Sequence, residues 1–190
     1  DVMLWAELED GEKIFGESNI SKSKKVISRI GYLPENPSAL PSALDSIKEA
    51  DLIVLGPGSL YTSLLPNLLV PEIVDALLKS KAPKIYISNL MTQPGETDGL
   101  DVYKHIKSIE KQLSNFGVNS RIFNAILSQI QFEKSPLIDY YKSRGAEPVE
   151  CNKEELLSEG YYVLQAPLYA RRITPTLRHD SRRLARAVMF

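Results

Sequence analysis

The chain has 190 residues, 43% of them hydrophobic and 25% charged, and its formal net charge at pH 7 is −1. This composition is typical of a soluble globular protein with one well-filled domain. The near-neutral charge argues against nucleic acid as the main partner, because binding to a phosphate backbone relies on a basic surface. The single cysteine, Cys151, excludes an internal disulfide and fits the reducing cytoplasm. No apolar run approaches the ~20 residues of a membrane-spanning helix.

Residues 2–33 predict an antiparallel hairpin segment. Apolar residues alternate with others over residues 2–8, with the period of two that is typical of a strand. Asp10-Gly11 is a favourable hairpin turn, and residues 13–17 and 25–33 supply two further strands. Trp5 is expected to pack rather than to bind a ligand. Because a strand begins at once, we expect residues 1–190 to form a single domain that is incomplete at its N-terminal side.

From Pro41 onward, helical and strand patterns alternate. The expected helices cover residues 41–50, 71–80, 102–116, 136–144, 153–159 and 181–189. The expected strands cover residues 52–55, 85–90, 122–127 and 161–164. This alternation predicts an α/β fold in which a mostly parallel sheet has helices on both faces, preceded by the antiparallel segment. Ligands in such folds bind at the carboxyl ends of the strands.

The stretch LIVLGPGSLYTS, residues 52–63, is the first candidate site. Its four apolar residues predict a strand buried on both faces, and Pro66 interrupts any helix that begins at Ser59. Glycines let the backbone turn tightly, and the hydroxyl residues that follow could cap a helix and leave its first N–H groups free. Such a turn suits a phosphate. An ordinary strand-to-loop turn is the alternative. A dinucleotide-dependent oxidoreductase fits less well, because Tyr61 replaces the third glycine of the fingerprint and no acidic residue follows about 20 residues later.

A second polar loop, residues 89–98, follows the next strand, and we interpret it as a binding loop rather than a solvated turn. Both loops should open on the same edge of the sheet. Glu96, Asp98 and Asp101 could hold magnesium, although acidic residues around a turn are more often simply exposed.

The C-terminal segment is basic, and Arg178 and His179 stand immediately before the last helix. From there they could point into the crevice, where a guanidinium group would bind a phosphate or diphosphate through paired N–H donors. The other arginines of this segment and His105, on a lysine-rich helix, are expected to be solvated. No Ser-His-Asp constellation is present, so no catalytic residue is assigned.

The strings LGPGSLYTSLLPNLLVPEI and SNLMTQPGETDGL, together with AELEDG and the terminal RHD, resemble the CofD-like superfamily and most of all its YvcK branch. The resemblance spans the chain and implies a Rossmann-like sheet. Its archetype is a 2-phospho-lactate transferase that uses a guanylyl-activated phospholactate and magnesium. The YvcK branch resembles a cytoplasmic sensor of UDP-sugars, notably UDP-N-acetylglucosamine, and implies no settled reaction.

Two positions correspond to family residues associated with UDP-sugar binding: Tyr141, in YKSRGAEPV, and Arg178, in RHD. Core packing through Leu137 is the alternative for Tyr141. The family's GGGTG-type and HSLGN-type segments are absent from the chain, and Gln129 stands where the family has asparagine. The complete set of candidate ligand-binding residues is Gly56, Gly58, Ser59, Tyr61, Thr62, Asn89, Thr92, Gln93, Glu96, Thr97, Tyr141 and Arg178.

The resemblance implies a cytoplasmic UDP-sugar-binding regulator that supports cell-wall synthesis, cell shape and growth on gluconeogenic carbon sources. Its expected partners are a nucleotide sugar and cell-wall synthesis proteins, with no nucleic acid and no membrane span, and it is compatible with a homo-oligomer. The alternative is a phospholactate-type transferase with a deazaflavin acceptor, and magnesium is expected only in that case.

Overall fold

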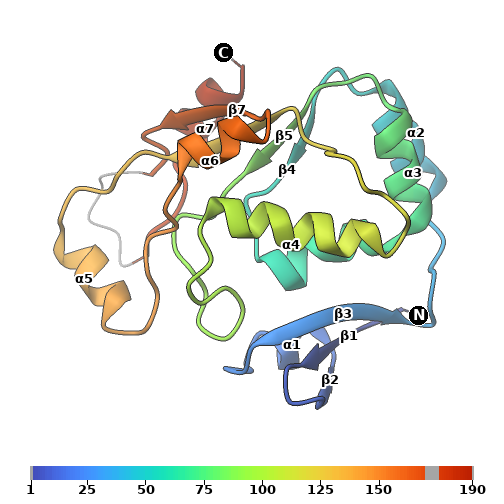
Figure 1. Cartoon of the computed structure of the whole chain (residues 1–190), viewed down its shortest axis with the longest axis horizontal. Helices are drawn as coiled ribbons and strands as arrows, with labels where there is room; N and C mark the ends of the chain where they lie inside the picture. The colour runs from blue at the N-terminus through green and yellow to red at the C-terminus, as the bar shows by residue number, and fades with distance from the viewer. Residues whose placement is uncertain (1, 170–175, 190) are drawn as a thin grey trace.

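The computed structural model describes residues 2–169 and 176–189 and contains two sheets. A three-stranded antiparallel sheet has the order β2-β1-β3, and a four-stranded parallel sheet has the order β4-β5-β6-β7. The antiparallel sheet lies below the parallel part of the fold, beneath helix α4 (Figure 1). The predicted α/β architecture with an antiparallel start is confirmed.

The antiparallel sheet consists of β1 (Met3–Leu8), β2 (Lys13–Phe15) and β3 (Ile27–Leu33), with the short helix α1 (Glu17–Ile20) after β2. Trp5 pairs with Gly31 across the sheet, and its ring covers that glycine so closely that a Cβ atom there would clash with it. The amino group of Lys13 and the guanidinium group of Arg29 lie over the same ring, at 4.8 and 5.5 Å from its centroid. Trp5 therefore packs within the sheet, as predicted.

The parallel sheet consists of β4 (Ile53–Leu55), β5 (Lys84–Ile87), β6 (Ala125–Gln129) and β7 (Tyr162–Ala166). The prediction that β4 is buried on both faces is wrong, because Val54 is 40% exposed. Among the described strands, β4 pairs with β5 alone, so it lies at the end of the sheet. Strand β6 begins later than predicted, because Asn124 brackets Lys84 with two hydrogen bonds of 2.8 Å, one of them through its side chain.

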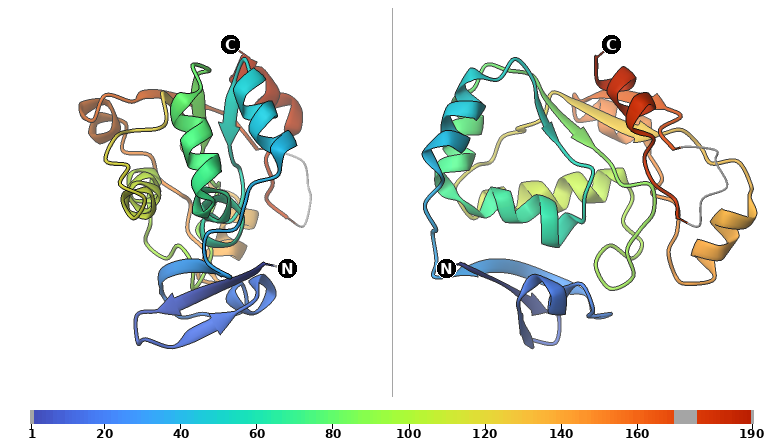
Figure 2. Two further views of the ribbon diagram at one scale, coloured as in Figure 1. Left: turned by 90° about the vertical axis from the view of Figure 1, so that its right-hand side faces the viewer. Right: turned by 180° about the vertical axis from the view of Figure 1, so that it is seen from behind.

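Helices cover both faces of the parallel sheet, as predicted (Figure 2). Alternate strand residues such as Tyr86 and Ile126 join a core with α4 (Val102–Ser114), α3 (Pro71–Lys79) and α6 (Lys153–Ser158). Ile87 and Leu127 face the other way, toward apolar residues of α7 (Ser181–Met189). Helix α2 (Pro41–Glu49) packs against α3 and has no fully buried residue.

Three short elements complete the fold. After β4 the chain forms a π-helical turn, η1 (Leu60–Leu64), and a 3-10 helix, η2 (Leu65–Leu69), so the chain changes its helical form next to Pro66. Helix α5 (Pro136–Lys142) begins at Ser135, whose hydroxyl accepts the Ile138 N–H, as its sequence predicts. No helix in the described part of the chain has the length and apolar character that crossing a bilayer requires.

Candidate functional site

A cavity of about 660 Å³ opens where β4 and β5 end, and we call it the β4–β5 cavity. Four segments that are distant in sequence line it: residues 57–59 after β4, residues 89–93 after β5, Tyr141 of α5, and residues 177–179 before α7. The position agrees with the rule that ligands of parallel α/β sheets bind at the carboxyl ends of the strands.

The glycine turn after β4 depends on a close approach between two strands. Gly56 has φ +102°, and a Cβ atom there would lie 2.5 Å from the Ile87 carbonyl oxygen, so only glycine fits without a shift. Beyond it, the Gly58 N–H donates to Oδ1 of Asn89 at 3.3 Å. The end of β4 is thus fastened to the end of β5, which places both loops at the same cavity.

Side-chain hydrogen bonds also fix the two loops, both to each other and to neighbouring parts of the chain. Nε2 of Gln93 donates to Oγ of Ser59 at 2.9 Å. Thr92, which is 4% exposed, accepts the Glu147 N–H with its hydroxyl group at 2.8 Å. The hydroxyl of the buried Thr97 accepts the Gln93 N–H at 2.8 Å. These contacts give the cavity wall a fixed shape.

Glu96 lies beneath the glycine turn rather than in the cavity. Its side chain is 6% exposed, its carboxyl group faces the backbone of Tyr61, and burial raises its pKa. The expectation that a hydroxyl group caps this helix is wrong, since η1 has no side-chain cap, and the Gly58 N–H that Asn89 holds lies before the first turn of η1. A carboxyl group already occupies one end of η1, where an anion was expected.

Tyr141 and Arg178 both line the cavity. The hydroxyl of Tyr141 accepts the Leu177 N–H at 3.0 Å, and its ring also packs against the apolar residues beneath α7, so packing and lining occur together. Arg178 is exposed. His179 lies against the backbone of Ser88, and burial lowers its pKa. Both residues of the RH pair therefore face the crevice, as predicted.

The structure divides the twelve candidates into two groups. Seven line the β4–β5 cavity: Gly58, Ser59, Asn89, Thr92, Gln93, Tyr141 and Arg178. The other five shape the loops around it: Gly56, Tyr61, Thr62, Glu96 and Thr97. Tyr61, for example, directs its hydroxyl group toward Ser108 of α4, and Thr62 is 7% exposed within η1.

The expectation that His105 is solvated is wrong. The side chain is fully buried on the inner side of α4, where burial lowers its pKa to about 4. Neither ring nitrogen has a hydrogen-bond partner among the described residues. The lysines that suggested a solvated helix lie on the opposite side of α4, where Lys104 and Lys111 are exposed.

Sequence reasoning missed a second cavity, of about 700 Å³, at the ends of β6 and β7. Gln129, Gln165, Phe132 and Cys151 contribute to its wall. Met91, which lines the β4–β5 cavity, forms a backbone bridge with Pro148, which lines the second one. The sequence signal was the run of polar residues after β6, but no motif distinguishes that run from a solvated loop.

The residues named for magnesium have other contacts. Asp98 accepts the Gly95 N–H, Asp101 caps α4 by accepting the Lys104 N–H, and Glu96 is buried at Tyr61. Within residues 2–169 and 176–189, no three His, Cys, Asp or Glu side chains gather in a way that could hold a metal ion. These three residues therefore do not fit a magnesium site.

The sequence profile of the family described as 2-phospho-L-lactate transferase CofD matches residues 1–169. The chain belongs to the CofD family. It is 38% identical over 184 residues to the gluconeogenesis factor of Bacillus subtilis, covering 97% of this chain and 56% of that protein. It is 41% identical over 161 residues to the gluconeogenesis factor of Listeria monocytogenes, covering 83% and 50%.

A solved structure shares the fold of this CofD-family chain. The crystal structure of a UPF0052 family member from Bacillus halodurans superimposes with a TM-score of 0.89 at 37% identity. The match covers the whole of this chain and 59% of the crystallised one. The chain spans about half the length of the curated relatives it matches.

Proposed function

We propose that this CofD-family chain contributes to a UDP-sugar-binding regulatory protein and that the β4–β5 cavity contacts the ligand. The observation that carries the proposal is the convergence of Arg178 and Tyr141 beside Ser59 and Gln93, although these residues come from four separate segments. A guanidinium group offers paired N–H donors that suit a diphosphate, and an aromatic ring offers a face on which a base or sugar can stack. The hydroxyl and amide groups after β4 and β5 suit the hydroxyl groups of a nucleotide sugar.

Titration calorimetry of the intact protein with UDP-N-acetylglucosamine tests the proposal. We expect Arg178→Ala to weaken binding by about 10- to 100-fold, the range for a charged hydrogen bond. Arg186→Ala is the matched control, because it removes the same charge from an exposed position of α7 outside the cavity lining. No heat signal with the wild-type protein, or equal affinity in Arg178→Ala, would contradict the proposal.

The gluconeogenic part of the wider role that we propose is supported by relatives named gluconeogenesis factors, and the cell-wall and cell-shape part by the resemblance to the YvcK branch. The protein would act in the cytoplasm and support cell-wall synthesis, cell shape and growth on gluconeogenic carbon sources, with cell-wall synthesis proteins as partners. Complementation of a deletion strain on such a carbon source tests this role. Growth and shape should recover with the wild-type gene and not with the Arg178→Ala variant.

A transferase is the second candidate, because the family profile that matches residues 1–169 is described as 2-phospho-L-lactate transferase. Incubation of the intact protein with guanylyl-phospholactate, a deazaflavin acceptor and magnesium distinguishes the two. Formation of the phospholactyl product would favour the transferase. Binding of UDP-N-acetylglucosamine without such a product would favour the regulator.

A further inference from the structure

The backbone around Arg178 is held from two directions, although Arg178 itself is exposed. Binding through the long side chain of an exposed arginine costs rotamer entropy, and a backbone that also had to be ordered would add a further entropic cost. The contacts that fix this backbone therefore affect how well Arg178 can bind an anion.

One set of contacts begins at Gln129, the last residue of β6. The side chain is 5% exposed, and its Oε1 accepts the N–H of the fully buried Leu168 at 2.6 Å. The Leu168 carbonyl accepts the Asp180 N–H at 2.7 Å, and the neighbouring Tyr169 forms a backbone bridge with His179. Through these bonds the centre of the sheet holds the chain immediately after Arg178.

The other contact comes from α5 and acts immediately before Arg178. The Tyr141 hydroxyl accepts the Leu177 N–H at 3.0 Å. A phenylalanine at this position would keep the ring but leave the Leu177 N–H without this acceptor. The two sets of contacts start on different elements and reach the two sides of the same residue.

We infer that Gln129 and Tyr141 are positioning residues, which hold the segment 177–180 so that Arg178 can bind the diphosphate of the ligand. The role of Gln129 is indirect, because it does not line the β4–β5 cavity. Gln129 ends β6, and its side chain joins this strand of the sheet to the segment that reaches the cavity before α7. The inference rests on the function proposed above.

Replacement of Gln129 by methionine tests the inference, because methionine has similar length and lacks the amide oxygen. We expect Gln129→Met to weaken UDP-N-acetylglucosamine binding about tenfold, the effect of about one net hydrogen bond. Gln165→Met is the matched control on the neighbouring strand β7, where the residue is exposed. It should leave the affinity unchanged.

A double-mutant cycle separates positioning from general destabilisation. If Gln129 acts through Arg178, then Gln129→Met should cause no further loss of affinity in the Arg178→Ala background. Tyr141→Phe should behave in the same way. Penalties that simply add to that of Arg178→Ala would overturn the inference.

Amide hydrogen exchange gives a readout that does not depend on any ligand. In Gln129→Met, exchange at Asp180 should accelerate at least tenfold while the amides in the middle of α4 keep their protection. Tyr141→Phe should accelerate exchange at Leu177. Unchanged exchange at both amides would refute the positioning role, whereas absence of UDP-N-acetylglucosamine binding to the wild-type protein would refute the proposed function.

Discussion

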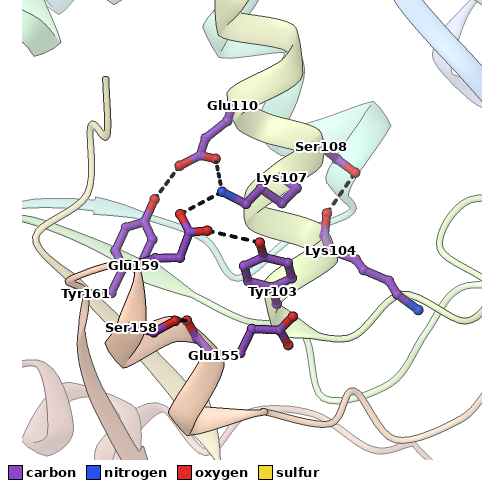
Figure 3. A network of polar contacts seen from close by, with 9 residues as sticks. All are labelled: Tyr103, Lys104, Lys107, Ser108, Glu110, Glu155, Ser158, Glu159 and Tyr161. Carbon is purple, nitrogen blue, oxygen red and sulfur yellow. Dashed lines mark hydrogen bonds and ion pairs between the residues drawn. The ribbon is translucent and has the colours of Figure 1, made fainter. Parts of the chain in front are cut away.

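The Tyr161 hydroxyl donates a hydrogen bond of 2.5 Å to Oε1 of Glu110, and this contact joins the residue before β7 to the middle of α4 (Figure 3). Oε2 of the same glutamate pairs with Nζ of Lys107 at 2.9 Å, and Lys107 also pairs with Glu159 at 2.8 Å. Tyr103 donates to Glu159 from the preceding turn of the helix. Three of these contacts hold α4 against the segment that leads from α6 into β7, and the Lys107–Glu110 pair lies within α4.

Tyr161→Phe should lower the free energy of unfolding by about 1 kcal/mol, because Glu110 loses the hydrogen bond that the Tyr161 hydroxyl donates. Urea denaturation at neutral pH measures the change. Tyr162→Phe is the matched control, since it removes the same atom from the adjacent residue, which is 76% exposed. Equal effects of the two substitutions would show that the hydrogen bond to Glu110 does not stabilise the fold.

Glu96→Gln should stabilise the protein at neutral pH relative to the wild type. Burial raises the pKa of Glu96 in the folded state, so its contribution to stability is fully present below the unfolded-state pKa and is lost as pH rises through the folded one. Glutamine keeps a side-chain oxygen of the same reach and carries no charge. Urea denaturation at pH 4 and pH 7 should therefore show a larger advantage of the variant at pH 7.

The exposed Glu35 offers the control for that experiment. Glu35→Gln should change the free energy of unfolding by less than about 0.5 kcal/mol at either pH. An advantage of Glu96→Gln that is the same at both pH values would mean that the buried carboxyl group is not the cause.

His105→Leu should reduce the loss of stability in acid. Burial lowers the pKa of His105 to about 4 in the folded state, whereas the unfolded chain binds the proton near the ordinary value of 6.5. Stability is therefore lost as pH falls from about 6.5 toward 4, by about 3 kcal/mol for a shift of this size. Chemical denaturation across this pH range should give a flatter profile for the variant. If the variant loses stability in acid as steeply as the wild type, His105 is not the cause of the acid sensitivity.

Gly56→Ala should destabilise the fold more than Gly99→Ala does. Both glycines have positive φ, +102° and +67°, so alanine is strained at either position by about 1 kcal/mol. Only at Gly56 would the new Cβ atom meet backbone, the Ile87 carbonyl oxygen at 2.5 Å, while nothing lies within 4 Å at Gly99. Thermal unfolding of the two variants measures the difference, and equal midpoints would contradict the close approach of β4 and β5.

Local signals predicted much of the fold, because the residues that carry them act on their nearest neighbours. Asn152 and Glu155 form the capping pair that their spacing predicts, and Asp180 accepts the N–H groups of Arg182 and Arg183 at the start of α7. The apolar residues of α4 are likewise spaced three and four apart, as a single buried face requires, and Ile106 and Ile109 are fully buried on it. Helix ends and faces depend on periodicity and caps, which a single sequence contains.

The rest depends on contacts between distant segments, which a single sequence does not reveal. His105 carries the same helical spacing as the buried apolar residues of α4, but neighbouring lysines suggested solvent. The sequence suggested that Glu96 is a ligand-binding carboxylate, whereas its side chain is buried and faces the backbone of Tyr61. The side chain of Gln129 has its role only because it accepts the N–H of Leu168, which lies 39 residues later in the chain.

The walls of the β4–β5 cavity extend in sequence from Pro57 to His179. Parallel pairing of β4 with β5 and the return of the chain before α7 must both be complete before the walls meet, so a partly folded chain has no cavity. Any ligand of this cavity consequently binds the native chain and not the unfolded one, and it raises the thermal midpoint with its concentration. Bound ligand then also lowers the rate of proteolysis, because cleavage requires the open chain.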